Sequence, residues 1–499
     1  MCSLPVRIDR VYDIFISLPL KYSNLAVMSA VSIDELVKRI SKLAKQNQEL
    51  EEHLKQLEKQ NEKMARENER QKSLLEQLSS QATGDTSQAD QRERSIKFNM
   101  ATVLFANIHG FSQLIQDIDS SEIMDELDEV LYEFDQIVNK YKIEKIKTIG
   151  DTYMCAGGIP VKNITNPIDV VMAAIEMRGF LKKYQNRKRG EGSHIWDLKI
   201  GVHTGPVTAA VTGKKKINYD IKGDTVNTAS RIETVSEKGD ILISVMTYEL
   251  VKEFFDCEYY GKLPVKYKAD LQMYQVKGLK AEFSIDGEGI IPNDAFRIKF
   301  GLIQFTDIQE MILDKLEKEL PDYLYYHNVK HTVDVVTEVE LIGWAEGCSD
   351  EEILILKTAA LFHDAGHTVG YDNHEHYGTL LARDMLPEYN YTQAQIDRIC
   401  EVIMSTKMPP TPKNLLEHII CDSDLDYLGR SDFIPVSNTL FEELKAQNKI
   451  GALNDWNKLQ VKFISGHQYF TQTARSLREV NKQQQIERIQ SLITPDQEK

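Results

Sequence analysis

A long heptad pattern near the start of the chain constrains its fold more than any other feature. Residues 33–80 contain neither glycine nor proline and are rich in Glu, Lys, Gln and Leu. A seam of about six heptads predicts a parallel coiled coil, and hence a homodimer. The positions of the seam repeat at alternating spacings of four and three: Leu36, Ile40, Leu43, Asn47, Leu50, Leu54, Leu57, Asn61, Met64, Asn68, Gln71, Leu75 and Leu78.

Three asparagines in this seam, Asn47, Asn61 and Asn68, fall at a positions of the heptad. A buried asparagine at such a position lowers stability but favours a paired, in-register dimer. The alternative interpretation of the segment is a single solvated, charged helix. The length of the seam favours the coiled coil.

The composition is that of a soluble globular protein, with 42% hydrophobic and 27% charged residues. The formal net charge of −16 argues against a general nucleic-acid-binding surface. The six cysteines lie far apart without a CxxC pair, which is typical of reduced thiols in the cytoplasm. No apolar run reaches the length that spans a bilayer. We therefore expect a cytoplasmic protein with neither a nucleic-acid nor a membrane partner.

Shifts in composition divide the chain into segments. The first is undecided, because Val11–Leu20 is apolar but short and is interrupted by Asp13. A signal peptide there would lack a clear cleavage site, and translation from Met28 would instead place residues 1–27 outside the native protein. The predicted segments are an N-terminal segment at 1–32, the coiled coil at 33–80, a polar linker at 81–95, a central domain at 96–282, a connector at 283–295 and a helical domain at 296–493.

The central domain alternates β-like runs with helical patterns, which predicts an α/β or α+β fold. The helical stretches include Ser121–Lys140 and Pro167–Tyr184. The β-like runs include Thr102–Ile108, Ile143–Ile149, Tyr153–Ala156, Leu198–His203 and Ile241–Val245.

Two segments of the central domain end in turns that suit a metal–nucleotide site. Val103–Ser112 breaks at His109-Gly110 before a predicted helix, and amides at a helix start can hold phosphate oxygens. Ile143–Met154 predicts a strand, a Gly-Asp turn and a second strand. Asp151 would then lie at the tip of a hairpin, where a carboxylate can bind Mg²⁺. A Gly-Asp pair taken alone is most often only a turn.

A third segment, Asn218–Arg231, places Asn227 and Arg231 four residues apart. On a helix they share one face, so an amide and a guanidinium can reach one ligand, and the guanidinium suits phosphate charge. Two ordinary polar residues on a helix would look the same. The three segments are therefore informative as a set.

Together the three segments resemble the catalytic domain of class III adenylyl and guanylyl cyclases, over Ile96–Leu279. That family has a ferredoxin-like α/β fold and builds its active site at the interface of two such domains. The resemblance implies an adenylate cyclase that converts ATP to cyclic AMP and pyrophosphate with Mg²⁺ or Mn²⁺. It assigns Asp151 and Asn107 to metal positions, Ile108, His109, Gly110 and Phe111 to substrate, Lys147 and Asp220 to adenine, Asn227 and Arg231 to the transition state, and Lys268 to the triphosphate.

The implied choice of adenine has a physical basis. Lys147 can donate a hydrogen bond to adenine N1, and Asp220 can accept one from the exocyclic amine, which discriminates against guanine. Guanylyl cyclases usually carry Glu and Cys at these two places. Arg231 and Lys268 would stabilise charge on the pyrophosphate leaving group.

Asn107 departs from the family pattern, which has a metal-binding aspartate at this position. An amide oxygen can coordinate Mg²⁺, but it brings no negative charge and does not serve readily as a base. Since one chain carries both metal-side and base-side residues, a homodimer would have two equivalent sites that share this change. The domain is then a weak cyclase, a cyclase with altered metal demand, or a nucleotide-binding pseudo-enzyme.

Histidines interleaved with Asp and Glu concentrate in the helical domain, between His327 and His418. His327 and His331 lie four residues apart on one predicted helix face. The adjacent His363 and Asp364 can coordinate metals that share the carboxylate. A lone helical histidine is usually structural. This density favours a metal site.

These motifs resemble the HD superfamily of metal-dependent phosphohydrolases, an all-α fold, over Phe296–Ile493. The string Tyr326–Val335 is similar to the signature of cyclic nucleotide phosphodiesterases, where the first histidine, here His327, protonates the leaving oxygen. The pair His374-Glu375 instead resembles other HD hydrolases. The resemblance implies a divalent metal pair of Zn, Mn, Mg or Fe at His331, His363, Asp364 and Asp424, with Asp422 as the fallback for the last, and with His367, His374 and Glu375 as further metal residues.

The sequence thus predicts a dimeric signalling protein with a coiled coil, a ferredoxin-like cyclase domain and an all-α HD domain. The cyclase would make cyclic AMP from ATP, and the HD domain would hydrolyse a phosphoester, with the cyclic nucleotide as the candidate substrate. One alternative is an HD phosphohydrolase regulated by a nucleotide-binding pseudo-cyclase. Another is a coiled-coil scaffold with inert domains, against which the intact His/Asp set argues.

Overall fold

The computed structural model describes residues 95–109, 120–188, 196–212, 218–264 and 270–494. Several predictions fall outside these residues: the N-terminal segment, the coiled coil, the linker up to residue 94, and the site residues Gly110, Phe111 and Lys268. No helix in the described part of the chain is both long enough and apolar enough to cross a membrane.

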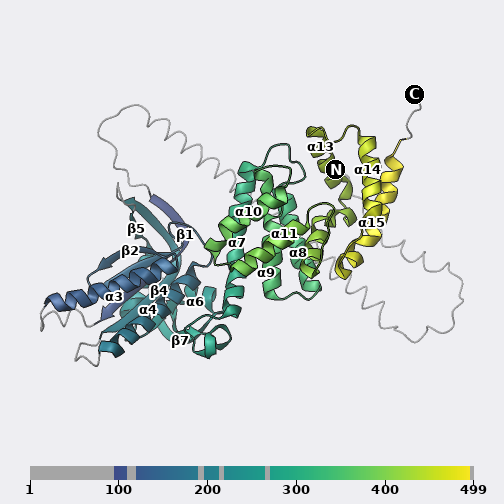
Figure 1. Cartoon of the computed structure of the whole chain (residues 1–499). Coiled ribbons are helices and arrows are strands. Elements are labelled where there is room, and N and C mark those ends of the chain that lie inside the picture. Colours follow the sequence, from purple (N-terminus) through teal and green to yellow (C-terminus); the bar gives the residue numbers. More distant parts are fainter. Residues whose placement is uncertain (1–94, 110–119, 189–195, 213–217, 265–269, 495–499) are drawn as a thin grey trace, which may run out of the picture. The chain divides into compact units, whose positions relative to one another are not determined.

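The central domain is built on one eight-stranded mixed sheet (Figure 1). Its strands are β1 (Ser95–His109), β2 (Glu144–Ile149), β3 (Thr152–Gly157), β4 (Asp197–Thr212), β5 (Asn218–Lys222), β6 (Ile241–Ser244), β7 (Phe255–Leu263) and β8 (Leu271–Leu279). Its helices are α3 (Ser120–Lys140), α4 (Asn166–Lys188), α5 (Asp224–Val235) and α6 (Val245–Val251). Two short 3₁₀ turns, η3 (Ala281–Phe283) and η4 (Ile285–Gly287), follow.

The order of the strands agrees with the predicted ferredoxin-like arrangement. The sheet runs β2-β3-β1-β4-β6-β8-β7, and β5 pairs with β4 outside this path. The first six elements therefore follow β-α-β-β-α-β, with β4-β1-β3-β2 as neighbours. These neighbours pair antiparallel, whereas β6 pairs with β4 in parallel.

Strand β1 is buried on both faces, because each face of the sheet has its own core. Leu104 and Ala106 pack in the core that includes residues of α3 and α4, which cover one face of the sheet (Figure 1). Val103 and Phe105 point to the opposite face and pack with α5 and β5. By the same alternation Asn107 belongs to the α5 face, where it interrupts an otherwise apolar run.

Helix α7 (Asp294–Glu319) opens the helical part of the chain and contributes to two cores. Asn293 caps the helix by accepting a hydrogen bond from the Phe296 amide at 3.0 Å. Phe296 packs edge to face on Phe254 of the sheet domain, with ring centroids 5.2 Å apart. Later residues of the same helix belong to the helical core: Phe305, Ile308, Ile312 and Leu316.

The rest of the described chain is helical, as predicted. The main core draws chiefly on α7 to α12, and a smaller core on the segments from η7 to α15. The elements are α8 (Val329–Ala345), α9 (Asp350–Phe362), η5 (Ala365–Thr368), α10 (His374–Met385), η6 (Leu386–Tyr389), α11 (Gln393–Ser405), α12 (Leu415–Asp424), η7 (Asp426–Gly429), α13 (Phe433–Ala446), α14 (Leu453–Gly466) and α15 (Gln472–Leu492).

Candidate active sites

The predicted metal position of the sheet domain lies where the end of β1 meets the β2–β3 turn. Gly150 has φ +61°, which lets the chain reverse there, and the Ile108 amide donates to the Asp151 carbonyl oxygen at 2.9 Å. Asn107 Nδ2 donates to Asp151 Oδ1 at 3.1 Å and to Thr152 Oγ1 at 2.8 Å. The structure therefore brings the Asn107 and Asp151 side chains together. Because the Ile108 amide already donates to the turn, it is not available to a phosphate oxygen.

Lys147 and Asp220, 73 residues apart in sequence, form an ion pair between β2 and β5. Lys147 Nζ lies 2.8 Å from Asp220 Oδ1, and the two side chains are 43% and 37% exposed. An ion pair this exposed contributes at most about 1 kcal/mol to stability. Both groups are accessible to a ligand, so a nucleobase with one acceptor and one donor could replace their mutual contact at little cost.

Asn227 and Arg231 lie one turn apart on α5, and both side chains are exposed. The opposite face of α5 is close to β4, because a Cβ on Gly201 would lie 2.1 Å from the Glu233 amide nitrogen. The glycine thus permits the close packing that fixes the helix. The buried face consists of Thr225, Thr228, Ala229 and Ile232. Asn227 and Arg231 are therefore directed away from their own sheet.

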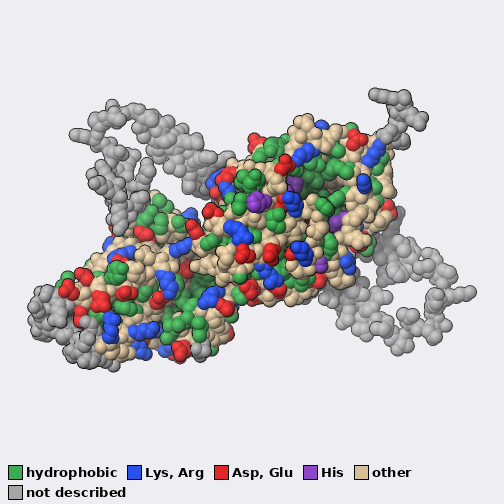
Figure 2. All heavy atoms as spheres, in the orientation of Figure 1, with side chains coloured by type: hydrophobic (Ala, Val, Ile, Leu, Met, Phe, Trp, Pro, Cys, Tyr) green, Lys and Arg blue, Asp and Glu red, His purple; other side chains and the backbone are tan. Residues whose placement is uncertain are grey.

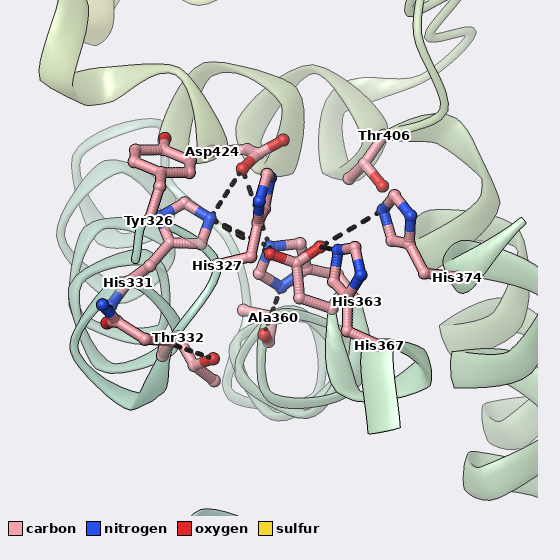
Figure 3. Close-up of polar contacts among 12 residues, drawn as sticks. Tyr326, His327, His331, Thr332, Ala360, His363, His367, His374, Thr406 and Asp424 are labelled. Carbon is pink, nitrogen blue, oxygen red and sulfur yellow. Dashed lines mark hydrogen bonds and ion pairs between the residues drawn. The ribbon is translucent and has the colours of Figure 1, made fainter. Parts of the chain in front are cut away.

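Four predicted ligands of the helical domain converge on one point. His331 lies in the first turn of α8, His363 and Asp364 directly follow α9, and Asp424 ends α12. The Nε2 atoms of His331 and His363 lie 3.3 and 3.2 Å from Asp364 Oδ2. They lie 3.1 and 3.6 Å from Asp424 Oδ1 (Figure 3). His331, His363 and Asp424 form a group whose ligand atoms lie within 4.8 Å of one another, as a metal site requires.

Local hydrogen bonds orient these imidazoles. Asn328 caps α8 and accepts from the Lys330 and His331 amides at 2.9 and 3.2 Å, which places His331 in the first turn. His363 Nδ1 lies 2.7 Å from the Ala360 carbonyl oxygen. Since a carbonyl only accepts, Nδ1 carries the proton, and Nε2 is left to face the carboxylates.

The electrostatics of this group favour positive charge. Burial lowers the pKa of His331, but the carboxylates of Asp364 and Asp424 outweigh burial and raise the pKa to about 9. Burial also opposes protonation of His363, and the same two carboxylates raise its pKa well above the usual value. Burial alone would raise the pKa of Asp364, yet the histidines hold this pKa well below its usual range. A divalent cation would compete with the histidine protons for the same ligand atoms.

A second group shares the Asp364 carboxylate. The ligand atoms of His327, Asp364 and His367 lie within 4.8 Å of one another. His374 stacks on His367 with ring centroids 3.9 Å apart, and its Nε2 lies 3.4 Å from Asp364 Oδ1. Glu375, also buried, lies 3.6 Å from His374 Nε2. Because Oδ2 of Asp364 faces the first group and Oδ1 the second, this carboxylate can bridge two cations.

His367 has the environment of a ligand rather than of a structural residue. Its side chain is fully buried, and neither ring nitrogen has a hydrogen-bond partner among the described residues. Burial lowers its pKa to about 3, so the ring is neutral. An unpaired buried polar group costs about 1–3 kcal/mol, a cost that coordination would remove. The residues of the second group therefore fit a metal ion.

The sequence did not single out Glu443 of α13. Its buried carboxylate lies 2.5 Å from His327 Nδ1 and accepts from the Tyr326 and His327 amides at 2.9 and 3.1 Å. Burial alone would raise the pKa of Glu443, but His327 and the two amides hold it below its usual value. Because Nδ1 of His327 is held by Glu443, Nε2 is the ring nitrogen that remains to act on a ligand. The adjacent Glu442 is exposed, and only packing distinguishes the two glutamates.

Asp422, the alternative ligand, has a structural role. It is fully buried and accepts hydrogen bonds from the Phe470 amide, the Thr471 amide and the Thr471 hydroxyl at 2.8, 2.8 and 2.7 Å. These bonds hold the start of α15 against the end of α12. Asp424 is the aspartate that faces the histidines.

Both groups are partly accessible. Histidine side chains reach the visible surface of the helical domain (Figure 2). The side chains of His327 and His374 in the second group are 19% and 21% exposed, and that of Asp424 in the first group is 21% exposed. Because His331 and Asp424 also line a cavity, a ligand can approach the first group as well.

Comparisons with known proteins agree with both halves of the chain. Residues 94–278 match the adenylate and guanylate cyclase catalytic domain, and residues 328–426 match the HD domain. The chain is 36% identical over 191 residues to receptor-type guanylate cyclase gcy-8 of Caenorhabditis elegans, which covers 38% of this chain and 16% of that protein. It is 32% identical over 191 residues to an adenylate cyclase of Mycobacterium bovis, which covers 38% of this chain and 42% of that protein.

Among solved structures, the adenylyl cyclase CyaB from P. aeruginosa is 32% identical, covers 37% of this chain and 95% of that chain, and has a TM-score of 0.35. The chain spans less than half the length of the two curated relatives it matches. It carries a class III cyclase catalytic domain followed by an HD domain. Because both adenylate and guanylate cyclases are among the relatives, the nucleobase has to be argued from the residues of this chain.

Exchanging Asp424 or Asp422 for asparagine separates the two roles assigned above. Asp424→Asn should lower the bound metal at least tenfold, because a ligand loses its charge. Asp422→Asn should keep the metal but lower the free energy of unfolding by about 1–3 kcal/mol, because buried donors lose their anionic acceptor. Elemental analysis and urea unfolding in chelator measure the two effects. Metal loss in Asp422→Asn together with retention in Asp424→Asn would reverse the assignment.

Proposed function

We propose that the cyclase domain converts ATP to cyclic AMP and pyrophosphate in a homodimer, and that the HD domain hydrolyses a phosphoester, namely the cyclic nucleotide. The observation that carries the adenine half is the accessible ion pair of Lys147 and Asp220. The ammonium can donate to adenine N1, and the carboxylate can accept from the exocyclic amine. Guanine presents the opposite donor and acceptor pattern at these two positions.

The exposure of the catalytic candidates supports a site shared between two protomers. Asp151 lies at the β2–β3 turn, whereas Asn227 and Arg231 face away from their own sheet on α5. A second copy of the domain would supply the missing side of each site, and the heptad segment at residues 33–80 would hold the copies together. The ribose 3′-hydroxyl would then lose its proton to water, and its oxygen would bond to the α-phosphorus as the bond to pyrophosphate breaks. Arg231 would stabilise the charge that develops.

The residues of the HD site support hydrolysis of a phosphodiester. When bound, a metal pair held by His331, His363, Asp364 and Asp424 and by His367 and His374 would activate water and neutralise phosphate charge, with His327 outside the ligand set. The water oxygen would bond to phosphorus and lose a proton to solvent, the bond from phosphorus to the leaving oxygen would break, and His327 Nε2 would supply a proton to that oxygen. Glu443 holds Nδ1 of the same ring and so orients it. For cyclic AMP the product is AMP.

Synthesis and breakdown in one chain would set a steady level or a pulse of cyclic AMP. The proposal that one chain combines synthesis with breakdown is motivated by the co-occurrence of the two domains. A second candidate function is an HD hydrolase that a nucleotide-binding pseudo-cyclase regulates. The contact between Asn107 and Asp151 favours it, because the amide replaces one of the two carboxylates of a two-metal cyclase site.

A double substitution tests the choice of base. Lys147→Glu with Asp220→Cys should reduce cyclic AMP formation at least tenfold and raise the ratio of cyclic GMP to cyclic AMP, because the hydrogen-bond pattern then suits guanine. The assay follows both products by chromatography with Mg²⁺ or Mn²⁺. Lys145→Glu is the matched control on the same strand, since Lys145 pairs with Asp135 of α3. Preference of the unmodified chain for GTP would refute the assignment.

The two neighbouring glutamates of α13 test the role given to His327. His327→Ala should lower kcat for cyclic AMP hydrolysis by about 10²–10⁴-fold, the usual range for loss of a general acid. Glu443→Gln should lower kcat by a smaller factor, with KM and metal content little changed, because it disturbs only the orientation of the ring. Glu442→Gln, at an exposed position, should behave as the unmodified chain does. Equal rates for Glu443→Gln and Glu442→Gln would contradict the positioning role.

A further inference from the structure

The side chain at position 107 is an amide that contacts the carboxylate of Asp151. We propose that this site takes ATP with one divalent cation instead of two, because the Asn107 amide occupies, as a hydrogen-bond donor to Asp151, the place of the second cation. The inference rests on the proposed function in one respect, namely that ATP is the ligand. It concerns the metal requirement of the site.

The orientation of the Asn107 amide follows from its neighbours. An ionised carboxylate can only accept hydrogen bonds, so the atom of Asn107 that faces Asp151 Oδ1 at 3.1 Å is the nitrogen. The reverse orientation would bring two oxygens that carry partial negative charge into contact. The same nitrogen donates to Thr152 Oγ1 at 2.8 Å. Both amide hydrogens are therefore used.

The sheet register fixes this contact. Asn107 pairs directly with Thr152 across β1 and β3, so their side chains extend from adjacent positions on one face. Asp151 comes immediately before Thr152, at the turn. An aspartate at position 107 would place a second carboxylate about 3 Å from that of Asp151, where like charges repel unless a cation lies between them. Asparagine removes the repulsion and with it the need for that cation.

Among the described residues, the charge that β4 brings to this point is positive. On the other neighbouring strand Asn107 pairs with Lys199, which brings a positive charge to the same region. Asp151 remains the carboxylate that contacts Asn107. Asp151 and the triphosphate oxygens then remain as the ligands of one cation.

Counting Mn²⁺ tests the inference without relying on turnover. Electron paramagnetic resonance measures free Mn²⁺ in the full chain with and without α,β-methylene-ATP, so that ions held by the HD domain cancel in the difference. The nucleotide should add one Mn²⁺ per chain to the unmodified protein and two to Asn107→Asp. Thr152→Val, which keeps the Asn107–Asp151 contact, should still add one. An increment of two or of zero in the unmodified protein would overturn the inference.

The rate of cyclic AMP formation separates this inference from the proposed function. Asn107→Asp should raise the rate about tenfold or more, because it restores a charged metal ligand. An increment of one Mn²⁺ without any cyclic AMP would support the inference and refute cyclase activity in the unmodified chain. An increment of two with turnover would refute the inference and leave the cyclase in place.

Discussion

The buried carboxylate of Asp364 is the charge around which the HD domain is arranged. Removing such a charge from water costs several kcal/mol, which only close positive partners can offset. Helix α8 and the end of α9 bring His331 and His363 to one of its oxygens, and His374 and His367 approach the other. Loss of any one of these elements would leave buried charge uncompensated. The same side chains therefore fix how these elements pack and where a metal can bind.

In the cyclase domain, by contrast, the side chains expected to bind the base and stabilise the transition state are exposed. Lys147 and Asp220 satisfy each other at the surface, and Asn227 and Arg231 project from α5 away from their own sheet. Such groups contribute little to the stability of one protomer. Their placement fits the proposed function, in which a second protomer and a nucleotide would complete the site. The HD site, in contrast, is complete within one chain.

Patterns of local spacing predicted much of this architecture. The β-like runs at Thr102–Ile108 and Tyr153–Ala156 lie within β1 and β3, and the His/Asp motifs meet as expected. The resemblance put Asp424 before Asp422, but spacing alone does not decide between them, because residues two apart on a helix point in different directions and only the packing of α15 shows that Asp422 is used elsewhere. Glu443 was not predictable either, since its contact with His327 spans 116 residues. The resemblance to cyclases, rather than spacing, paired Lys147 with Asp220.

In the proposed function, one chain both makes and breaks cyclic AMP. The most direct measurement incubates the full chain with ATP labelled at the α-phosphate and follows the label over time by chromatography. We predict that the label passes from ATP into cyclic AMP and then into AMP, and that it accumulates as cyclic AMP when His327 is replaced by alanine. Label that stays in ATP, or that reaches AMP without passing through cyclic AMP, would contradict the claim.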